Sequence, residues 1–160
     1  MLISEETRKK LAELKDKYPT RQASIMPALH LVFDEFGYLG VEQLDEAADI
    51  IGVSRLDMNE TASFYTLFPK QKVGKYLIQV CTNLSCALMG ADNLVEYLEE
   101  KLGIKLGETT PDGIFTLWNV ECLGSCGTAP MMQVNDEYYE DLTREKVDEL
   151  IENWRKGEGS

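Results

Sequence analysis

Four cysteines, arranged as two close pairs, are the residues of this sequence best suited to chemistry. The first pair is Cys81 and Cys86, and the second is Cys122 and Cys126. The 160-residue chain contains no other cysteine. If the two pairs meet in space, four thiolates lie together, and four thiolates are a ligand set for a zinc ion or an iron-sulfur centre.

Each cysteine pair follows an apolar segment that predicts a β-strand. Residues 76–80 (YLIQV) precede the first pair, and residues 114–120 (IFTLWNV) precede the second. A helix is predicted between them, over about 90–102, because four apolar residues recur there at helical spacing: Leu94, Val95, Leu98 and Leu102. Such a crossover makes the two strands parallel. Cys81 and Cys122 are therefore expected to leave the sheet at the same edge.

The spacing of the cysteines is compatible with more than one kind of site. A 2Fe-2S cluster takes four thiolates, two per iron, which agrees with ligands that come in pairs. The pattern C-x4-C, a 35-residue gap and C-x3-C differs, however, from the plant-type and bacterial ferredoxin patterns. Zinc also takes four thiolates, although C-x2-C is its more usual pair. A thiol-disulfide centre is expected to contain C-x-x-C, which is absent, and simple packing of buried cysteines is the remaining alternative.

Small residues are concentrated beside the cysteines, at Ser85, Ala87, Gly124, Ser125 and Gly127. Glycine and other small residues let the backbone approach a metal-bound sulfur and donate N–H groups to it. Each glycine taken alone is also explained by an ordinary turn. Their concentration next to the cysteines favours the iron-sulfur hypothesis.

The first 68 residues predict about four short helices, and a polar linker follows them. Apolar periodicity, N-cap residues and terminal glycine or proline place these helices at about 5–18, 21–36, 41–51 and 55–65. The polar linker covers residues 70–74. We therefore expect a helical N-terminal domain over 1–72 and a second domain over 73–160.

The second domain is predicted to be a thioredoxin-like α/β unit with a small mixed sheet. Two further short strands are expected at 131–134 and 137–139, followed by a helix that Thr143 caps. The order of elements is then strand, helix, strand, strand, strand, helix. The expected fold class is α/β, with an N-terminal helical segment followed by the thioredoxin-like domain.

Several side chains near these elements are expected to serve packing. Phe64, Tyr65 and Phe68 are expected in the core, with contact to a partner as the alternative. His30, the sole histidine, is expected to be a partly buried helix residue because four sulfurs already complete a ligand set. The methionines near the cysteines are expected to pack and not to act as ligands: Met89, Met131 and Met132.

Composition limits the classes of partner. At 44% hydrophobic residues the chain can form a real core, and its net charge of −12 argues against binding to nucleic acid or anionic lipid. No apolar run is long enough to span a membrane, and the acidic N-terminus does not resemble a targeting peptide. We therefore expect a cytoplasmic protein, in which paired cysteines indicate metal binding or redox chemistry before structural disulfides.

Two alternative functions have support in the sequence. Residues 44–65 resemble a helix-turn-helix, which would fit a DNA-binding redox sensor, but Arg55 is offset there by Asp57 and Glu60. A free-standing ferredoxin is the other alternative, and the long helical prefix argues against it. Nucleotide-binding motifs of the G-x-G-x-x-G and G-x-x-x-x-G-K-[ST] types are absent, so nucleotide and flavin are expected on another chain.

Several motifs together resemble the thioredoxin-like 2Fe-2S subunit (the E subunit) of respiratory NADH:quinone oxidoreductase, complex I. The resemblance covers nearly the whole chain. It rests on residues 27–31 (PALHL), 64–68 (FYTLF), 81–90 with the first cysteine pair, 121–130 (ECLGSCGTAP) and 135–143 (NDEYYEDLT). The segment 121–130 is highly specific.

The resemblance implies a one-electron carrier with one 2Fe-2S cluster per chain. It implies that Cys81, Cys86, Cys122 and Cys126 are both the metal ligands and the cofactor-binding residues, with no catalytic residue on this chain. The implied partner is the flavin-bearing subunit of bacterial NADH:quinone oxidoreductase, which binds FMN and NADH. The chain would lie on the cytoplasmic side, peripheral to the inner face of the cell membrane, and would not turn over NADH alone. Related subunits occur in NAD-linked hydrogenases and formate dehydrogenases, so the host complex stays open at this point.

Overall fold

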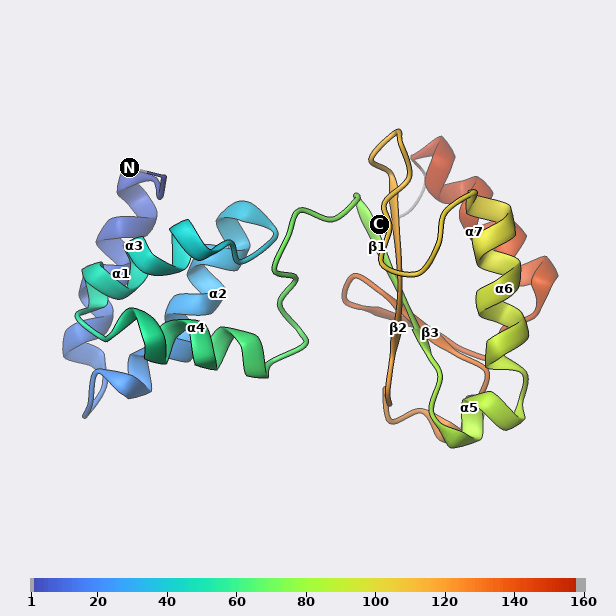
Figure 1. Cartoon of the computed structure of the whole chain (residues 1–160), viewed down its shortest axis with the longest axis horizontal. Coiled ribbons are helices and arrows are strands. Elements are labelled where there is room, and N and C mark those ends of the chain that lie inside the picture. The colour runs from blue at the N-terminus through green and yellow to red at the C-terminus, as the bar shows by residue number, and fades with distance from the viewer. Residues whose placement is uncertain (1, 158–160) are drawn as a thin grey trace. The chain divides into compact units, whose positions relative to one another are not determined.

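The chain forms two compact units, Met1–Lys72 and Val73–Ser160, in a computed structural model that describes residues 2–157 (Figure 1). The first unit contains helices only, and the second contains the sheet with its helices. Each unit is a separate folding problem with its own hydrophobic core, and each is described by itself below.

Four α-helices make up the first unit, as the sequence predicts. They are α1 (Glu5–Lys17), α2 (Ile25–Phe36), α3 (Val41–Ile51) and α4 (Arg55–Phe64), and a short 3-10 helix (Gln22–Ser24) precedes α2. The side chains of Ser4 and Ser54 accept hydrogen bonds from backbone N–H groups in the first turns of α1 and α4. Gly37 and Gly52 end α2 and α3 in the left-handed region, which glycine adopts at low cost. The predicted boundaries are therefore accurate to within a few residues.

The core of the helical unit is built from aliphatic residues of all four helices and closed by Phe68. The Phe68 ring is buried and makes edge contacts with the rings of His30 and Phe33, at centroid distances of 5.1 and 5.5 Å. The prediction of core packing is right for Phe68 but wrong for Phe64 and Tyr65, whose side chains are exposed. Because α4 ends at Phe64, the chain has left the helix before an aromatic side chain reaches the core.

The second unit is a four-stranded mixed sheet with three helices. Its strands are β1 (Tyr76–Cys81), β2 (Phe115–Val120), β3 (Met132–Val134) and β4 (Glu137–Tyr139), in the order β2-β1-β3-β4. Strands β1 and β2 are parallel, and the other neighbours are antiparallel. The helices are α5 (Leu84–Leu88), α6 (Ala91–Leu102) and α7 (Arg144–Lys156), and a 3-10 turn covers Cys126–Thr128. This architecture confirms the predicted fold class.

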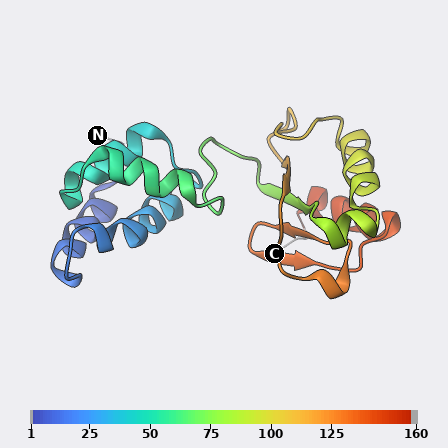
Figure 2. The same ribbon diagram turned by 60° about the horizontal axis from the view of Figure 1, so that its bottom comes forward.

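Helices α6 and α7 lie on the same side of the sheet (Figures 1 and 2). Their apolar faces share one core with the strands. The far end of this core from the cysteines is aromatic: the Tyr76 ring stacks on Phe115 and on Trp154, at centroid distances of 5.8 and 5.4 Å. Packing at this end thus ties β1, β2 and α7 together and leaves the cysteine end to loops and α5.

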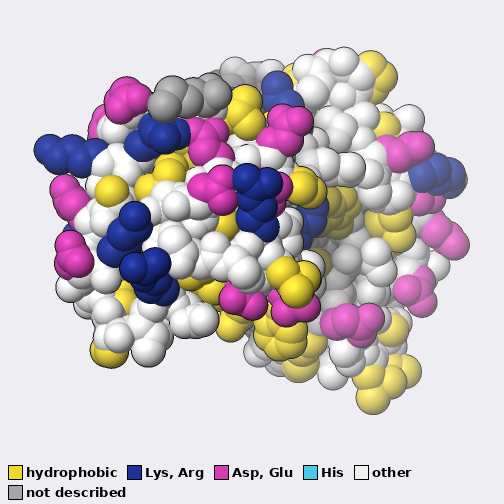
Figure 3. Space-filling model, turned by 60° about the vertical axis from the view of Figure 1, so that its left-hand side comes forward, with side chains coloured by type: hydrophobic (Ala, Val, Ile, Leu, Met, Phe, Trp, Pro, Cys, Tyr) yellow, Lys and Arg dark blue, Asp and Glu magenta, His cyan; other side chains and the backbone are white. Residues whose placement is uncertain are grey.

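The segment that resembles a helix-turn-helix spans α3 and α4. Arg55, the first residue of α4, forms ion pairs with Asp45 and Asp49, at 3.4 and 2.7 Å. On the face shown in Figure 3, Lys and Arg side chains lie interspersed with Asp and Glu. Because the charge of Arg55 is already offset by two carboxylates, the segment has little left with which to attract phosphates. Absence of nucleic-acid binding stays a prediction.

Among residues 2–157, no helix combines the length and the apolar character that crossing a membrane requires.

The Tyr76 hydroxyl generates a prediction about stability. Among the described residues it is the one buried side-chain polar atom without a hydrogen-bond partner. An unsatisfied buried hydroxyl costs about 1–3 kcal/mol, so Tyr76→Phe is expected to stabilise the protein by about 1 kcal/mol and raise the melting temperature by several degrees. Calorimetry checks this.

The matched control is Tyr97→Phe, which removes a hydroxyl that donates to Asp148 Oδ1 over 2.5 Å. This variant is expected to melt at or below the temperature of the natural protein. A lower melting temperature for Tyr76→Phe would show that its hydroxyl has a partner in solution.

Candidate metal centre

The register of two parallel strands brings the cysteine pairs to one end of the sheet. Cys81, the last residue of β1, lies opposite Val120, the last residue of β2. The pairing continues one step further, since the Thr82 N–H donates to the carbonyl of Val120 over 3.0 Å. Cys122 therefore follows two residues beyond the end of β2. This confirms the prediction that the two strands are parallel and leave the sheet together.

Cys86 is positioned by a short helix that periodicity in the sequence does not predict. Asn83 caps α5 by accepting a hydrogen bond from the Leu84 N–H over 2.7 Å. The helix turns Cys86 inward, where its side chain is buried with Cys81 in a small apolar cluster: Ala91, Ala129 and Met131, with Leu123 packed against it. Asn83 is the available signal for this helix, because asparagine is among the preferred N-cap residues.

The second cysteine pair lies on an exposed loop. Cys122 and Cys126 are exposed, whereas Cys81 and Cys86 are buried. Gly124, between the exposed pair, has a φ of +79°, a conformation that side chains other than glycine rarely adopt. This bend lets the Gly124 N–H donate to Cys122 Sγ over 3.4 Å. The loop thus folds its own backbone toward the sulfur, as a metal-binding loop requires.

A hydrogen-bond network around Glu140 holds the loop that carries Cys126. The Glu140 carboxylate accepts hydrogen bonds from the hydroxyls of Ser125 and, over 2.6 Å, Thr128. Those two hydroxyls also contact each other at 2.9 Å. The hydrogen bonds lower the pKa of Glu140 below its ordinary value. Residues on both sides of Cys126 are therefore tied to a carboxylate from the segment that follows β4.

The pKa values of the buried cysteines diverge because their thiols are neighbours. Burial acts to raise the pKa of Cys81, but the backbone N–H groups of Asn83 and Leu123 and the thiols of Cys86 and Cys122 outweigh it, and the pKa is lowered. Burial, with the negative charge and hydrogen bond of Cys81, raises the pKa of Cys86 to about 11. Cys126 also acts electrostatically on Cys86. The four sulfurs are thus within interaction range of one another.

The donor set fits a binuclear iron-sulfur centre. It consists of four cysteine sulfurs divided into a buried pair and an exposed pair, and a 2Fe-2S cluster takes two thiolates on each iron. Over residues 2–157 there is no group of three or more His, Cys, Asp or Glu side chains that could hold a metal ion by itself.

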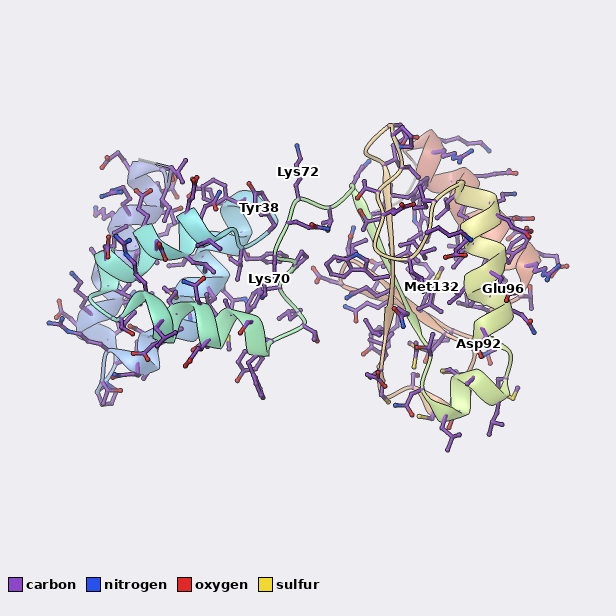
Figure 4. The ribbon with its side chains drawn as sticks, in the orientation of Figure 1. Tyr38, Lys70, Lys72, Asp92, Glu96 and Met132 are labelled. Carbon is purple, nitrogen blue, oxygen red and sulfur yellow. The ribbon has the colours of Figure 1, made fainter. Side chains whose placement is uncertain are left out.

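The methionines near the cysteines differ from one another. Met131 and Met132 are buried, as predicted, and Met132 lies on the side of the sheet that α6 covers (Figure 4). Met89 does not pack in the core, contrary to the prediction, because it follows α5 on its outer face and is 61% exposed. His30 is also more exposed than expected and touches only the edge of the Phe68 ring from the helical unit.

The fold and the cysteine arrangement define a thioredoxin-like 2Fe-2S protein. Residues 11–155 match the family model for thioredoxin-like 2Fe-2S ferredoxins, and the chain belongs to this family. The family resemblance seen in the sequence is thereby confirmed, together with a cofactor of one 2Fe-2S cluster.

Curated relatives narrow the assignment to one kind of respiratory subunit. The chain is 48% identical to an NADH-quinone oxidoreductase E subunit, the one numbered 2, of Rhizobium meliloti over 142 residues, which are 89% of this chain and 84% of the relative. It is 47% identical to NADH-quinone oxidoreductase subunit 2 of Thermus thermophilus over 150 residues, 92% of this chain and 83% of the relative. The chain is thus an electron-transfer protein of the same family as these subunits.

A solved structure agrees on the fold. An NAD+-reducing NiFe-hydrogenase in the air-oxidized state superposes with a TM-score of 0.71 at 23% identity, covering 83% of this chain and 23% of the hydrogenase chain. At this identity the likeness concerns the fold, which includes both the helical unit and the α/β unit.

The network around Glu140 predicts the effect of a charge-neutral substitution. Glu140→Gln keeps the size of the side chain but weakens acceptance from Ser125 and Thr128, so the variant should melt at a lower temperature at pH 7 than the natural protein. Because the folded-state pKa of Glu140 is lowered, its stabilising effect is fully present above the ordinary value of 4.5 and lost as pH falls through the lowered pKa. The difference between the two proteins should therefore shrink in acid.

Glu149→Gln is the control, because Glu149 is an exposed residue of α7. Calorimetry between pH 4 and pH 7 gives the comparison. Equal effects of the two substitutions at pH 7 would contradict a special role for Glu140.

Proposed function

We propose that Cys81, Cys86, Cys122 and Cys126 hold one 2Fe-2S cluster and that the chain transfers single electrons beside a flavin-bearing subunit of NADH:quinone oxidoreductase. The buried pair, Cys81 and Cys86, would bind one iron, and the exposed pair, Cys122 and Cys126, would bind the other. The observation that carries the proposal is the register of β1 with β2, which ends both strands at the same edge of the sheet.

When bound, the cluster supplies a site that gains and loses one electron without moving atoms far. The chain's own residues set the conditions for this. Burial of Cys81 and Cys86 excludes water from one side of the site, and the Gly124 N–H donates to Cys122 Sγ on the other. N–H donation stabilises added negative charge on a thiolate, while the acidic character of the chain opposes it. We expect a low reduction potential, in the range of NADH and flavin.

The exposed cysteine pair gives the site a direction. Electron transfer needs a short path to the partner, and Cys122 and Cys126 are at the surface whereas the other two sulfurs are not. We place the flavin-bearing, NADH-binding subunit against this side. FMN and NADH would then be bound by the partner, and this chain would contribute no nucleotide-binding residue.

The host complex is proposed from the relatives. Two proteins with 48% and 47% identity are named as subunits of NADH-quinone oxidoreductase, and both align over more than four fifths of their length. This similarity favours respiratory complex I over an NAD-linked hydrogenase or a formate dehydrogenase. In that complex we place the chain on the cytoplasmic side, peripheral to the inner face of the cell membrane.

The ligand assignment predicts a specific spectroscopic result. After anaerobic reduction with dithionite, electron paramagnetic resonance should give one rhombic S = 1/2 signal, from one binuclear centre per chain. Cys→Ser at any of the four positions should weaken or alter this signal, because oxygen replaces a thiolate on one iron. Ser85→Ala, beside Cys86, is the control and should leave the signal intact. A colourless protein with stoichiometric zinc would contradict the assignment.

The division of labour between subunits predicts the behaviour of the isolated chain. Loaded with its cluster, it should not oxidise NADH, because FMN and NADH are bound elsewhere. Addition of the flavin-bearing subunit and NADH should reduce the cluster, which the visible spectrum reports. NADH oxidation by the isolated chain would overturn this division.

A further inference from the structure

Helix α5 carries three exposed apolar side chains next to the metal centre. Leu84, Leu88 and Met89 are 71%, 79% and 61% exposed. Positions four and five apart fall on one side of a helix, and the opposite side turns Cys86 into the interior. One element of five residues therefore joins a buried ligand candidate to an outward apolar surface, which we call the α5 surface.

The α5 surface does not stabilise the unit that carries it. Apolar side chains that stay in water contribute no burial free energy, and grouped exposure of this kind marks interaction sites. The residues of the α/β core are buried elsewhere, between the sheet and helices α6 and α7. The position of three such side chains within a few residues of Cys86 thus indicates a function outside the fold.

The charges around the α5 surface are all of one sign. The sequence contains no Lys or Arg between Lys75 and Lys101, nor between Lys105 and Arg144, and the two cysteine pairs lie within these stretches. Acidic residues are present in both, among them the exposed Glu121. Asp92 and Glu96 are exposed on the first turns of α6, the helix that follows α5 (Figure 4). The apolar surface is therefore flanked by carboxylates.

The cations of α7 that are closest in sequence to this end already have partners. The Arg144 guanidinium lies over the Tyr97 ring, 4.9 Å from its centroid. The Lys146 ammonium donates to the carbonyl of Asp141 over 2.8 Å. The acidic field at the cysteine end is thus not neutralised by free basic side chains from α7.

We propose that the α5 surface, formed by Leu84, Leu88 and Met89, is the anchor by which the cluster-bearing end docks on a hydrophobic pocket rimmed by Lys and Arg on the flavin-bearing subunit. This inference rests on the proposed function and adds the residues and the chemistry of the contact. The apolar side chains would supply the buried centre of the interface, and Glu96 with its neighbours would supply the charged rim.

Charge decides between this occupant and the others. A second copy of the chain would place carboxylates against carboxylates, and like charges in an interface are unfavourable. An anionic lipid surface is excluded by the same repulsion. A basic protein surface is the partner whose charge complements this end.

The experiment measures binding of the cluster-loaded full chain to the flavin-bearing subunit of its complex by biolayer interferometry. Leu88→Ser should weaken binding about tenfold or more, as expected for an interface anchor. Leu106→Ser, an exposed leucine before β2, is the matched control and should change binding little. Glu96→Lys should weaken binding most at low salt, and Glu152→Lys on α7 should not.

The outcomes separate the two proposals. If the natural chain binds and Leu88→Ser binds equally well with its cluster signal intact, the docking inference is overturned while the proposed function stands. If the natural chain does not bind at all, both fall. A dimer of the natural chain that Leu88→Ser dissociates would assign the surface to a second copy, and a large drop in melting temperature would assign it to the chain's own packing. Either result overturns the inference.

Discussion

The parallel pairing of β1 and β2 is the constraint on which the metal centre depends. Six residue pairs join the two strands, from Tyr76 opposite Phe115 to Cys81 opposite Val120. A shift of one residue would turn every side chain of a strand to the other face, so the register is enforced by the buried apolar residues on both strands. Because the register is enforced, the loops that follow the strands start side by side. The cysteine pairs inherit their proximity from this pairing, although 35 residues separate them in the sequence.

The site that results is asymmetric, and the asymmetry organises the proposed function. One cysteine pair is buried among small apolar residues, and the other lies on an exposed loop that Glu140 holds through two hydroxyls. Burial protects one side of a cluster from water, and exposure gives the other side access to a partner. The same end of the unit carries apolar side chains on α5 and an excess of carboxylates. Electron transfer and partner recognition are thus concentrated at one end of the sheet.

The sequence predicts the parts of this fold that follow from periodicity. The four N-terminal helices, the two long strands and their parallel pairing all rest on repeated apolar positions and on glycine or cap residues at the ends. Helix α5 escapes prediction because it has five residues, three apolar side chains in and beside it point outward, and no periodic pattern emerges. The burial predicted for Phe64 and Met89 is wrong for the same reason, because an apolar residue type does not reveal which way the side chain points.

Long-range contacts between side chains are equally beyond the sequence. Glu140 contacts Ser125, which lies 15 residues away, and the acidic and polar residue types alone do not distinguish this carboxylate from its neighbours. The four cysteines can be grouped from the sequence only because no other cysteine competes with them. Their assignment as ligands stays a prediction.

The most direct test of that assignment is anomalous diffraction at the iron absorption edge from crystals of the cluster-loaded protein. Our account predicts two adjacent iron sites at the end of β1 and β2, one bound by Cys81 and Cys86 and the other by Cys122 and Cys126. A single metal ion, or four sulfurs joined as two disulfides, would contradict it.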